Sequence, residues 1–343
     1  MSDTINRQWL LRRRPEGMVS VDDFEYREVP VPEPDLAAGE ILVRNLYLGF
    51  DPAMRGWITD ARSYIPPVPL GEPMRAVAVA EVVASENAAY PVGTLVQGLY
   101  GWQEYAVASP NDPLPPMPLP EGTPPTIPLS VMGMTSLTAY FGLLDVGQPK
   151  AGETVVVSGA AGATGSMVVQ IAKLKGCRVV GIAGAPRKCQ YAVETLGYDA
   201  CISHYDEDMP AQLAAACPDG IDVYFENVGG SSWAAVMPLL NTFARIPVCG
   251  LIAHYNETGL PPGPDRMVQL QGLILRRSLK MQGFIVSNYR HRYPEFARDM
   301  ATWLAEGKVT YREDVVEGLE NAPQAFLGLF SGQNFGKLVV RVS

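Results

Sequence analysis

The chain has 343 residues, 47% of them hydrophobic and 18% charged, and its formal net charge is −9 at pH 7. This length favours two domains, and the composition is that of an ordinary globular protein. The negative charge argues against nucleic acid as a partner, because phosphate binding requires clustered Lys and Arg. No apolar stretch is long enough for a membrane span, and residues 1–25 lack an apolar signal core. We therefore expect a cytoplasmic protein without a membrane partner.

The spacing of cysteine and histidine argues against a metal site. All five cysteines lie in the second half of the chain without CxxC spacing: Cys177, Cys189, Cys201, Cys217 and Cys249. None of the three histidines, His204, His254 and His291, forms a close pair with a cysteine at ligand spacing. We expect free buried thiols and no bound metal.

Residues 1–128 predict a small all-β barrel with long loops. Short β-like runs such as EILVRNLYLGF and RAVAVAEVVA alternate with proline and glycine, and no long helical period occurs. The proline-rich stretch from Pro110 to Pro128 suits neither a helix nor a central strand, so we expect a surface linker there. The last apolar run, KLVVRV, suits a β-rich body, so residues 307–343 are expected to complete this first domain.

Residues 129–306 predict a second domain built around ETVVVSGAAGATGSMVVQIAK, residues 153–173. Residues 155–157 are all valine, which is typical of a strand buried on both faces. Gly159, Gly162 and Gly165 follow, and a helical apolar period begins at Ser166. A strand, a glycine turn and a helix in this order indicate a dinucleotide site, with the pyrophosphate at the helix N-terminus. The alternative is an ordinary turn between a strand and a helix.

Regular alternation of strands and helices follows this motif. The strand-like runs are CRVVGIAG, DACISH, IDVYFENVGG, ARIPVCG and KMQGFIVSN, and helices are expected at residues 188–196, 209–217, 232–240 and 291–306. This pattern is typical of a doubly wound parallel sheet, so the fold class is α/β. We expect the cofactor cleft between the two domains, where ligand pockets often form.

The turn after the second strand favours NADPH over NADH. NAD-binding units usually carry an acid about twenty residues past the glycine turn. Here no acid occurs between Gly165 and Glu194, and the turn reads GAPRKC, with Arg187 and Lys188 where a 2′-phosphate would arrive. Cations in this position favour the extra phosphate. A solvated basic turn at the start of a helix is the alternative.

The motifs together resemble one family. The glycine turn, YFENVGG, ARIPVCGLIAHYN, GFIVSN, LPPGPDR and SGQNFGKLVV are similar to those of the zinc-free medium-chain dehydrogenase/reductases. Within that family, the chain resembles the leukotriene B4 dehydrogenase and prostaglandin reductase group, and most of all its bacterial NADPH-dependent curcumin reductases. The resemblance covers nearly the whole chain and implies a GroES-like barrel followed by a Rossmann domain. It also implies reduction of the carbon–carbon double bond of α,β-unsaturated ketones and aldehydes by NADPH, commonly in a homodimer.

The resemblance also implies a set of site residues. Pyrophosphate contacts are expected at Ala161, Gly162, Ala163 and Thr164, the 2′-phosphate at Lys188 and the adenosine ribose near Tyr205. Nicotinamide-side contacts are expected at Asn227, Cys249, Gly250, Leu251, Ile252, Tyr255, Phe284, Ile285, Val286 and Asn334. One departure is Ala53 in DPAMR, where many relatives have tyrosine. The shape of the entrance to the site therefore remains open.

Reduction of an enone without a metal requires hydrogen-bond donors for the developing negative charge on the carbonyl oxygen, and one such donor is worth about 2.7–4 kcal/mol. Tyr255, beyond the carboxyl end of the fifth strand, is the first candidate, although it could instead be a packing residue. Tyr64, in ARSYIPPV, resembles the position of a second substrate-facing tyrosine, and anchoring of its loop is the alternative. His254 shows no partner in the sequence and receives no role.

Two other functions remain open at this point. A quinone oxidoreductase would share the fold, the cofactor and the lack of zinc. A non-catalytic NADPH-binding redox sensor would share the site but would not turn over.

Overall fold

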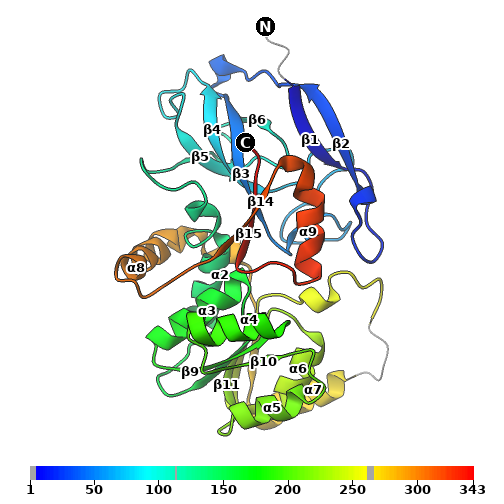
Figure 1. Cartoon of the computed structure of the whole chain (residues 1–343), viewed down its shortest axis with the longest axis vertical. Helices are drawn as coiled ribbons and strands as arrows, with labels where there is room; N and C mark the ends of the chain where they lie inside the picture. The colour runs from blue at the N-terminus through cyan, green and yellow to red at the C-terminus, as the bar shows by residue number, and fades with distance from the viewer. Residues whose placement is uncertain (1–4, 113, 261–265) are drawn as a thin grey trace. The chain divides into compact units, whose positions relative to one another are not determined.

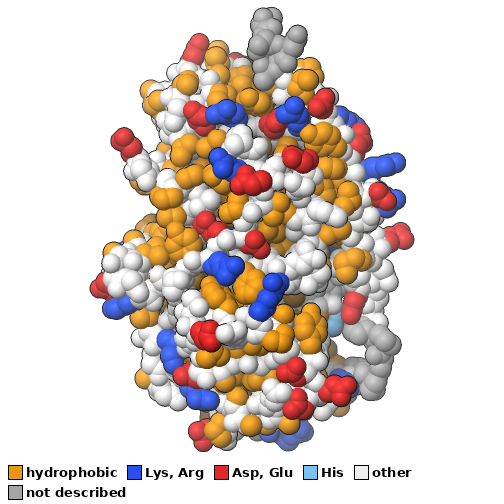
Figure 2. Space-filling model, viewed as in Figure 1, with side chains coloured by type: hydrophobic (Ala, Val, Ile, Leu, Met, Phe, Trp, Pro, Cys, Tyr) orange, Lys and Arg blue, Asp and Glu red, His pale blue; other side chains and the backbone are white. Residues whose placement is uncertain are grey.

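The computed structural model describes residues 5–112, 114–260 and 266–343, and the chain divides into two compact units (Figure 1). The first unit contains Met1–Gly133 and Glu313–Ser343, and the second contains Met134–Arg312. On the face shown in Figure 2, acidic and basic side chains are interspersed on the surface. No helix within the described residues has the length and apolar character needed to cross a lipid bilayer.

The first unit is built on β-strands. Its larger sheet has the order β14-β15-β3-β4-β5-β7, with β6 paired to β3, and a separate hairpin joins β1 to β2. The strands are β1 (Ile5–Leu11), β2 (Phe24–Pro30), β3 (Ile41–Phe50), β4 (Val77–Ala84), β5 (Leu95–Leu99), β6 (Tyr105–Ala108), β7 (Met117–Pro118), β14 (Glu313–Glu317) and β15 (Lys337–Arg341). Two helices, α1 (Met54–Trp57) and α9 (Ala322–Phe330), accompany them. The rings of Phe24, Phe50 and Phe326 surround the fully buried Trp102 in the core.

The end of the chain belongs to this first sheet, as its sequence predicts. Strand β15 pairs antiparallel with β3, with Leu338 opposite Phe50. The buried ammonium of Lys337 donates to Asp51 Oδ1 at 2.6 Å and to the Phe50 carbonyl at 3.0 Å. A buried ion pair with a second acceptor fixes the tail against the beginning of the unit.

The second unit contains a six-stranded parallel sheet with the order β10-β9-β8-β11-β12-β13. Its strands are β8 (Thr154–Ser158), β9 (Arg178–Ala183), β10 (Ala200–Ser203), β11 (Ile221–Phe225), β12 (Leu240–Val248) and β13 (Lys280–Gly283). Its helices are α2 (Met134–Phe141), α3 (Ala163–Leu174), α4 (Pro186–Tyr191), α5 (Met209–Ala216), α6 (Gly230–Val236), α7 (Met267–Arg277) and α8 (Tyr293–Ala305). The central strand β8 is buried throughout, as its run of valines predicts. The predicted α/β class, a β-rich domain with a Rossmann sheet, is confirmed.

One helix is not predicted from the sequence. Helix α7 lies between β12 and β13, and none of its residues is fully buried. Its sequence, MVQLQGLILRR, carries Leu270, Leu273 and Ile274 at helical spacing, and the last two pack against the core of the second unit. This spacing was the available signal, although exposed apolar side chains such as Val268 and Leu275 interrupt the pattern.

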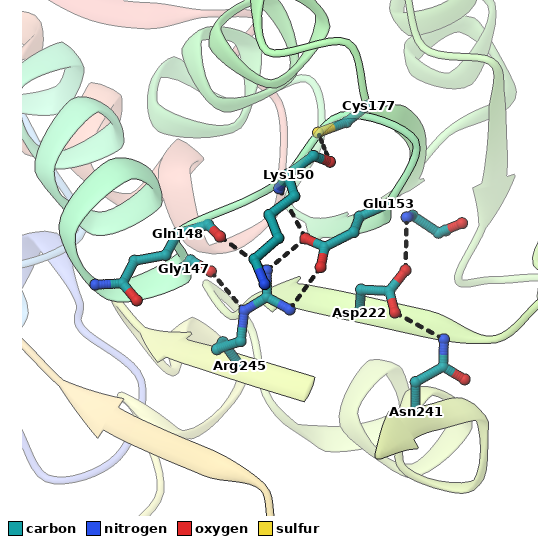
Figure 3. A network of polar contacts seen from close by, with 9 residues as sticks. Gly147, Gln148, Lys150, Glu153, Cys177, Asp222, Asn241 and Arg245 are labelled. Carbon is teal, nitrogen blue, oxygen red and sulfur yellow. Dashed lines mark hydrogen bonds and ion pairs between the residues drawn. The ribbon is translucent and has the colours of Figure 1, made fainter. Parts of the chain in front are cut away.

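Polar contacts tie β8, β11 and β12 together at their amino ends (Figure 3). The Arg245 guanidinium of β12 donates to the carbonyls of Gly147 and Gln148 at 2.9 and 2.8 Å and forms an ion pair with Glu153, just before β8. Asp222 of β11 accepts from the Thr154 amide and from the Asn241 side chain, both at 2.9 Å. These contacts hold the sheet at the end opposite to the predicted site.

Candidate active site

The predicted cofactor residues of the second unit follow the carboxyl ends of its parallel strands, and we call this end of the sheet the carboxyl edge. The turn after β8 begins at Gly159, whose φ of +66° is a conformation that favours glycine. A Cβ at Gly165 would lie 3.0 Å from the backbone of Ala160, so the first turn of α3 packs directly on this turn. The glycines are therefore required by backbone shape, as the motif predicts.

The N-terminus of α3 is suited to an anion. The helix begins after Gly162, its first turn contains no acidic residue, and no side chain within the described residues caps it. The first amides of a helix lack partners inside the helix, and they carry its positive partial charge. The predicted contacts Ala161, Gly162, Ala163 and Thr164 occupy this turn, so its backbone can bind a phosphate.

The ends of β9 and β10 bring Lys188 and Tyr205 to neighbouring positions. Ser203 Oγ donates to the Gly184 carbonyl at 2.8 Å and accepts from the Tyr205 amide at 3.2 Å. Lys188 is 9% exposed in α4, whereas the ring of Tyr205 is 68% exposed. The pKa of His204 is lowered first by burial and further by the positive charge of Lys188, which lies close to it. A buried cation and an exposed aromatic ring thus lie at this end of the carboxyl edge.

A cavity of about 510 Å³ adjoins the same strand end. Its lining combines the turn after β10 with α5 and α6 and includes His204, Asp206, Met209, Ser231, Ala234 and Leu239. Its lining combines these polar side chains from the turn with apolar ones from the two helices, and the cavity is open to solvent.

The end of β11 places Asn227 against β8. The Asn227 amide donates to Ser158 Oγ at 2.9 Å, and its side-chain Nδ2 donates to the Ser158 carbonyl at 2.7 Å. The preceding residue, Glu226, is 1% exposed and accepts from Ser158 Oγ at 2.8 Å. Glu226 and Ser158 are not among the residues predicted from the sequence. The sequence signal for Glu226 was an acid directly after the apolar run IDVYF. A carboxyl group that is buried in the interior of a sheet needs several hydrogen-bond donors.

The loop after β12 carries Cys249, Gly250, Leu251, Ile252 and Tyr255. The amides of Cys249 and Gly250 donate to the Glu226 carbonyl at 2.9 and 3.1 Å. Tyr255 is half-buried, and its hydroxyl oxygen accepts from the Leu251 amide at 3.3 Å. A Cβ at Gly250 would lie 2.9 Å from this hydroxyl, so glycine leaves the room that the tyrosine occupies. A neutral phenol can both accept and donate a hydrogen bond.

The thiol of Cys249 is held in its protonated form. Burial, together with the charge of Glu226, raises the pKa of Cys249 to about 12. Because the thiolate is the reactive form, Cys249 is chemically quiet at neutral pH.

His254 has two partners that the sequence does not reveal. Its Nδ1 lies 2.8 Å from Glu257 Oε2, and its Nε2 accepts from the Gly230 amide at 3.1 Å. A ring that accepts at Nε2 carries its proton at Nδ1, where it donates to the carboxylate. His254 therefore joins the loop after β12 to the start of α6.

The remaining predicted residues lie apart from these contacts. Phe284 is buried against Phe225, with ring centroids 6.2 Å apart, while Ile285 and Val286 are half-buried. A contact from Phe284 to a cofactor would therefore come from its backbone. Residues 261–265 of the LPPGPDR motif lie outside the described residues.

Three predicted positions belong to the first unit. Tyr64 is 51% exposed, and its hydroxyl oxygen accepts from Trp57 Nε1 at 2.7 Å, while burial of the hydroxyl raises the pKa of Tyr64. Asn334 donates from Nδ2 to the Gly336 carbonyl at 3.1 Å. Ala53 precedes α1 and packs against the core, so its small side chain leaves the start of this helix less covered than tyrosine would.

Comparisons with known proteins agree with this architecture. A family model described as the N-terminal domain of oxidoreductase matches residues 7–115, and one described as zinc-binding dehydrogenase matches residues 163–302. Within the described residues, no three or more His, Cys, Asp or Glu side chains form a group that could hold a metal ion.

Similar proteins match over almost the full chain. The NADPH-dependent curcumin reductase of Escherichia coli is 50% identical, over 98% of this chain and 97% of the relative. Prostaglandin reductase 1 of Rattus norvegicus is 41% identical over 98% of each chain. The crystal structure of CurA from Vibrio vulnificus in complex with NADPH has a TM-score of 0.94 at 52% identity and covers 98% of this chain and 99% of that one. The chain belongs to the zinc-free medium-chain dehydrogenase/reductases, within the group of the curcumin and prostaglandin reductases.

Proposed function

We propose that this protein is an NADPH-dependent reductase of the carbon–carbon double bond of α,β-unsaturated ketones and aldehydes. The observation that carries the proposal is the arrangement at the carboxyl edge, where the uncapped N-terminus of α3 accompanies a buried Lys188. An open helix terminus suits a pyrophosphate, and a cation in place of the usual acid suits a 2′-phosphate. The names of the relatives support a reductase that acts on small molecules.

The residues of the carboxyl edge would hold the cofactor along its length. The turn of Ala161, Gly162, Ala163 and Thr164 binds the pyrophosphate through backbone amides. Lys188 pairs with the 2′-phosphate, and Tyr205 covers the adenosine beside the cavity. Asn227, the loop after β12 and residues 284–286 take the nicotinamide side. Bound NADPH supplies the hydride that is added to the β-carbon of the substrate.

The substrate is activated by hydrogen bonds. Negative charge develops on the carbonyl oxygen as the β-carbon is reduced, and Tyr255 donates its phenol proton in a hydrogen bond to this oxygen. Tyr64 and Asn334 belong to the first unit, and their roles in orienting the substrate and closing the site stay predictions of the family resemblance. His254 holds the Tyr255 loop to the start of α6 through the Gly230 amide.

The assay that tests the function compares an enone, an enal and a quinone as acceptors for NADPH oxidation. We expect kcat/KM for the enone to exceed that for the quinone, with a saturated product. A higher kcat/KM for the quinone would favour a quinone oxidoreductase. NADPH binding without consumption of any acceptor would favour a redox sensor.

We also propose that the protein forms a homodimer. Strand β13 is the edge of the sheet, and all four of its residues, KMQG, are exposed. Exposed apolar side chains accompany it, including Met281 on the strand and Leu275 on α7. An exposed edge strand offers unpaired backbone groups to a second chain, and a two-fold axis allows β13 to meet its own copy.

A further inference from the structure

We propose that Glu226 is a positioning residue, which holds Asn227 and the loop after β12 in place at the carboxyl edge without touching the substrate. This inference rests on the proposed function. Glu226 follows β11 directly and is 1% exposed. Its Oε1 accepts four hydrogen bonds, from Ser158 Oγ at 2.8 Å, the Tyr224 hydroxyl at 2.9 Å and the amides of Val228 and Gly229 at 2.8 and 2.9 Å.

These contacts join three strand ends. Ser158 is the last residue of β8, and its hydroxyl donates to Glu226 while accepting from the Asn227 amide. The Glu226 amide donates to the Pro247 carbonyl of β12 at 3.0 Å, and its carbonyl accepts from the first two amides after that strand. A single residue thus connects β8, β11 and β12 at the end where the cofactor is proposed to bind.

The loop that carries Tyr255 depends on the segment fixed by Glu226. The carbonyls of Asn227 and Val228 accept from the amides of Ile252 and Ala253 at 3.2 and 3.0 Å. The Val228 amide itself donates to the Glu226 carboxylate. Movement of that carboxylate would therefore also move Asn227 and the loop that carries Tyr255.

The second carboxyl oxygen of Glu226 is the feature that packing does not explain. Oε1 accepts all four hydrogen bonds, and the buried Oε2 has no hydrogen-bond partner within the described residues. A glutamine could accept the same bonds at its oxygen, but its Nε2 would bury two N–H donors in the place of Oε2. A carboxylate makes each bond shorter and stronger than an amide oxygen does, and so holds the donating amides in fixed directions. We therefore attribute the choice of glutamate to precise placement of Asn227 and the loop after β12.

Asp222 provides a matched control because it joins the same three strands at their other end. It also lies on β11, and its carboxylate accepts from Thr154 at the start of β8 and from Asn241 of β12 (Figure 3). If acids between these strands act only through stability of the sheet, Glu226→Gln and Asp222→Asn should behave alike.

The test measures Tm, the Kd for NADPH by calorimetry, and kcat and KM with an enone for both variants. We expect Glu226→Gln to raise the Kd for NADPH and to lower kcat about tenfold each, as loss of a charge-assisted hydrogen bond predicts. Asp222→Asn should lower Tm and leave Kd and kcat within about twofold of the wild type. Equal changes in Tm for the two variants, with Kd and kcat unchanged in both, would overturn the inference.

A second variant keeps the inference testable if Glu226→Gln does not fold. Ser158→Ala removes one small hydroxyl and breaks the link between Glu226 and Asn227, so the Kd for NADPH should rise by several fold. An unchanged Kd in Ser158→Ala would contradict the inference. The Kd for NADPH is measured without a substrate, so it does not depend on whether the wild type reduces enones. A failure of the proposed function would appear in the enone assay of the wild type and not in this Kd.

Discussion

The hydroxyl oxygen of Tyr255 lies 3.3 Å from the Leu251 amide, within the loop that follows β12. If this hydroxyl stabilises the developing oxyanion, Tyr255→Phe should lower kcat roughly a hundredfold and leave the Kd for NADPH nearly unchanged. Steady-state kinetics with an enone and a calorimetric titration measure the two effects. Tyr26→Phe, on the exposed strand β2, is the control and should behave as the wild type. An unchanged kcat in Tyr255→Phe would remove Tyr255 from the mechanism.

In the proposed function, Lys188 pairs with the 2′-phosphate and so sets the preference for NADPH. Lys188→Ala should raise the Kd for NADPH roughly tenfold or more, since a charge-assisted contact to the 2′-phosphate is lost. The Kd for NADH serves as the internal control and should change little, because NADH lacks that phosphate. Equal losses of affinity for both cofactors would contradict the assignment of Lys188 to the phosphate.

The five thiols should differ in reactivity toward electrophiles, which matters in a protein proposed to bind enones. Burial raises the pKa of Cys249 to about 12 and that of Cys217 to about 11, whereas a hydrogen bond with the Cys201 thiol lowers the pKa of Cys189. Since the thiolate reacts, N-ethylmaleimide at pH 7.5 should label Cys189 before Cys217 and Cys249. Peptide mass spectrometry over a time course measures the order. Labelling of Cys249 as fast as that of Cys189 would contradict this account.

At the scale of single elements, the contacts at the amino ends of β8 and β12 predict a pH dependence. Burial alone would raise the pKa of Glu153, but hydrogen bonds from Arg245 and from the Lys150 amide hold it below its ordinary value. A lowered pKa in the folded state stabilises the fold above about pH 4.3, and this contribution is lost as the pH falls through the lowered value. The Tm difference between wild type and Glu153→Gln should therefore be largest above pH 5 and shrink toward pH 3. A difference that is constant from pH 7 to pH 3 would contradict it.

The elements that could be predicted are those whose sequence follows from burial or backbone shape. Strand β8 is buried on both faces and therefore reads as a run of valines, and the turn after it needs glycine at Gly159 and Gly165. Helix α7 is not predicted although Leu270, Leu273 and Ile274 recur at helical spacing, because exposed apolar residues such as Val268 and Leu275 obscure the period. Between Leu95 and Ala108 the chain forms two strands, β5 and β6, and Gly101 between them has a φ of +73°.

The residues of the candidate site could be predicted only where they belong to a recognisable sequence motif. Lys188 follows from the turn after β9 and Tyr205 from the family resemblance, and the structure joins the turns that carry them through Ser203. Glu226 and His254 could not be found in this way, because their importance depends on partners far along the chain. The partners of Glu226 include Ser158, and that of His254 is the Gly230 amide.

At the scale of the whole molecule, the exposed strand β13 predicts assembly. Met281→Arg would place a charge on each copy at the proposed contact, where like charges would face each other across the two-fold axis. Sedimentation at micromolar concentration should show a dimer for the wild type and a monomer for the variant. The control is Val92→Arg, at an exposed position of the first unit, which should remain dimeric. A wild type that is monomeric at all concentrations would contradict the proposed homodimer.

The fold class follows from the order of strands and helices, but the chemistry depends on a few side chains at one edge of one sheet. The same Rossmann sheet serves many reactions, so the fold does not identify the acceptor. The support for an enone comes from the relatives, and the phenol of Tyr255 is a suitable hydrogen-bond donor for its carbonyl.

The most direct measurement follows the hydride itself. NADPH deuterated at the transferring carbon of the nicotinamide is supplied with an enone, and the product is analysed by mass spectrometry and NMR. The account predicts a saturated ketone with deuterium on the carbon that was β to the carbonyl. Deuterium on the carbonyl carbon of an alcohol, or no consumption of NADPH, would contradict it.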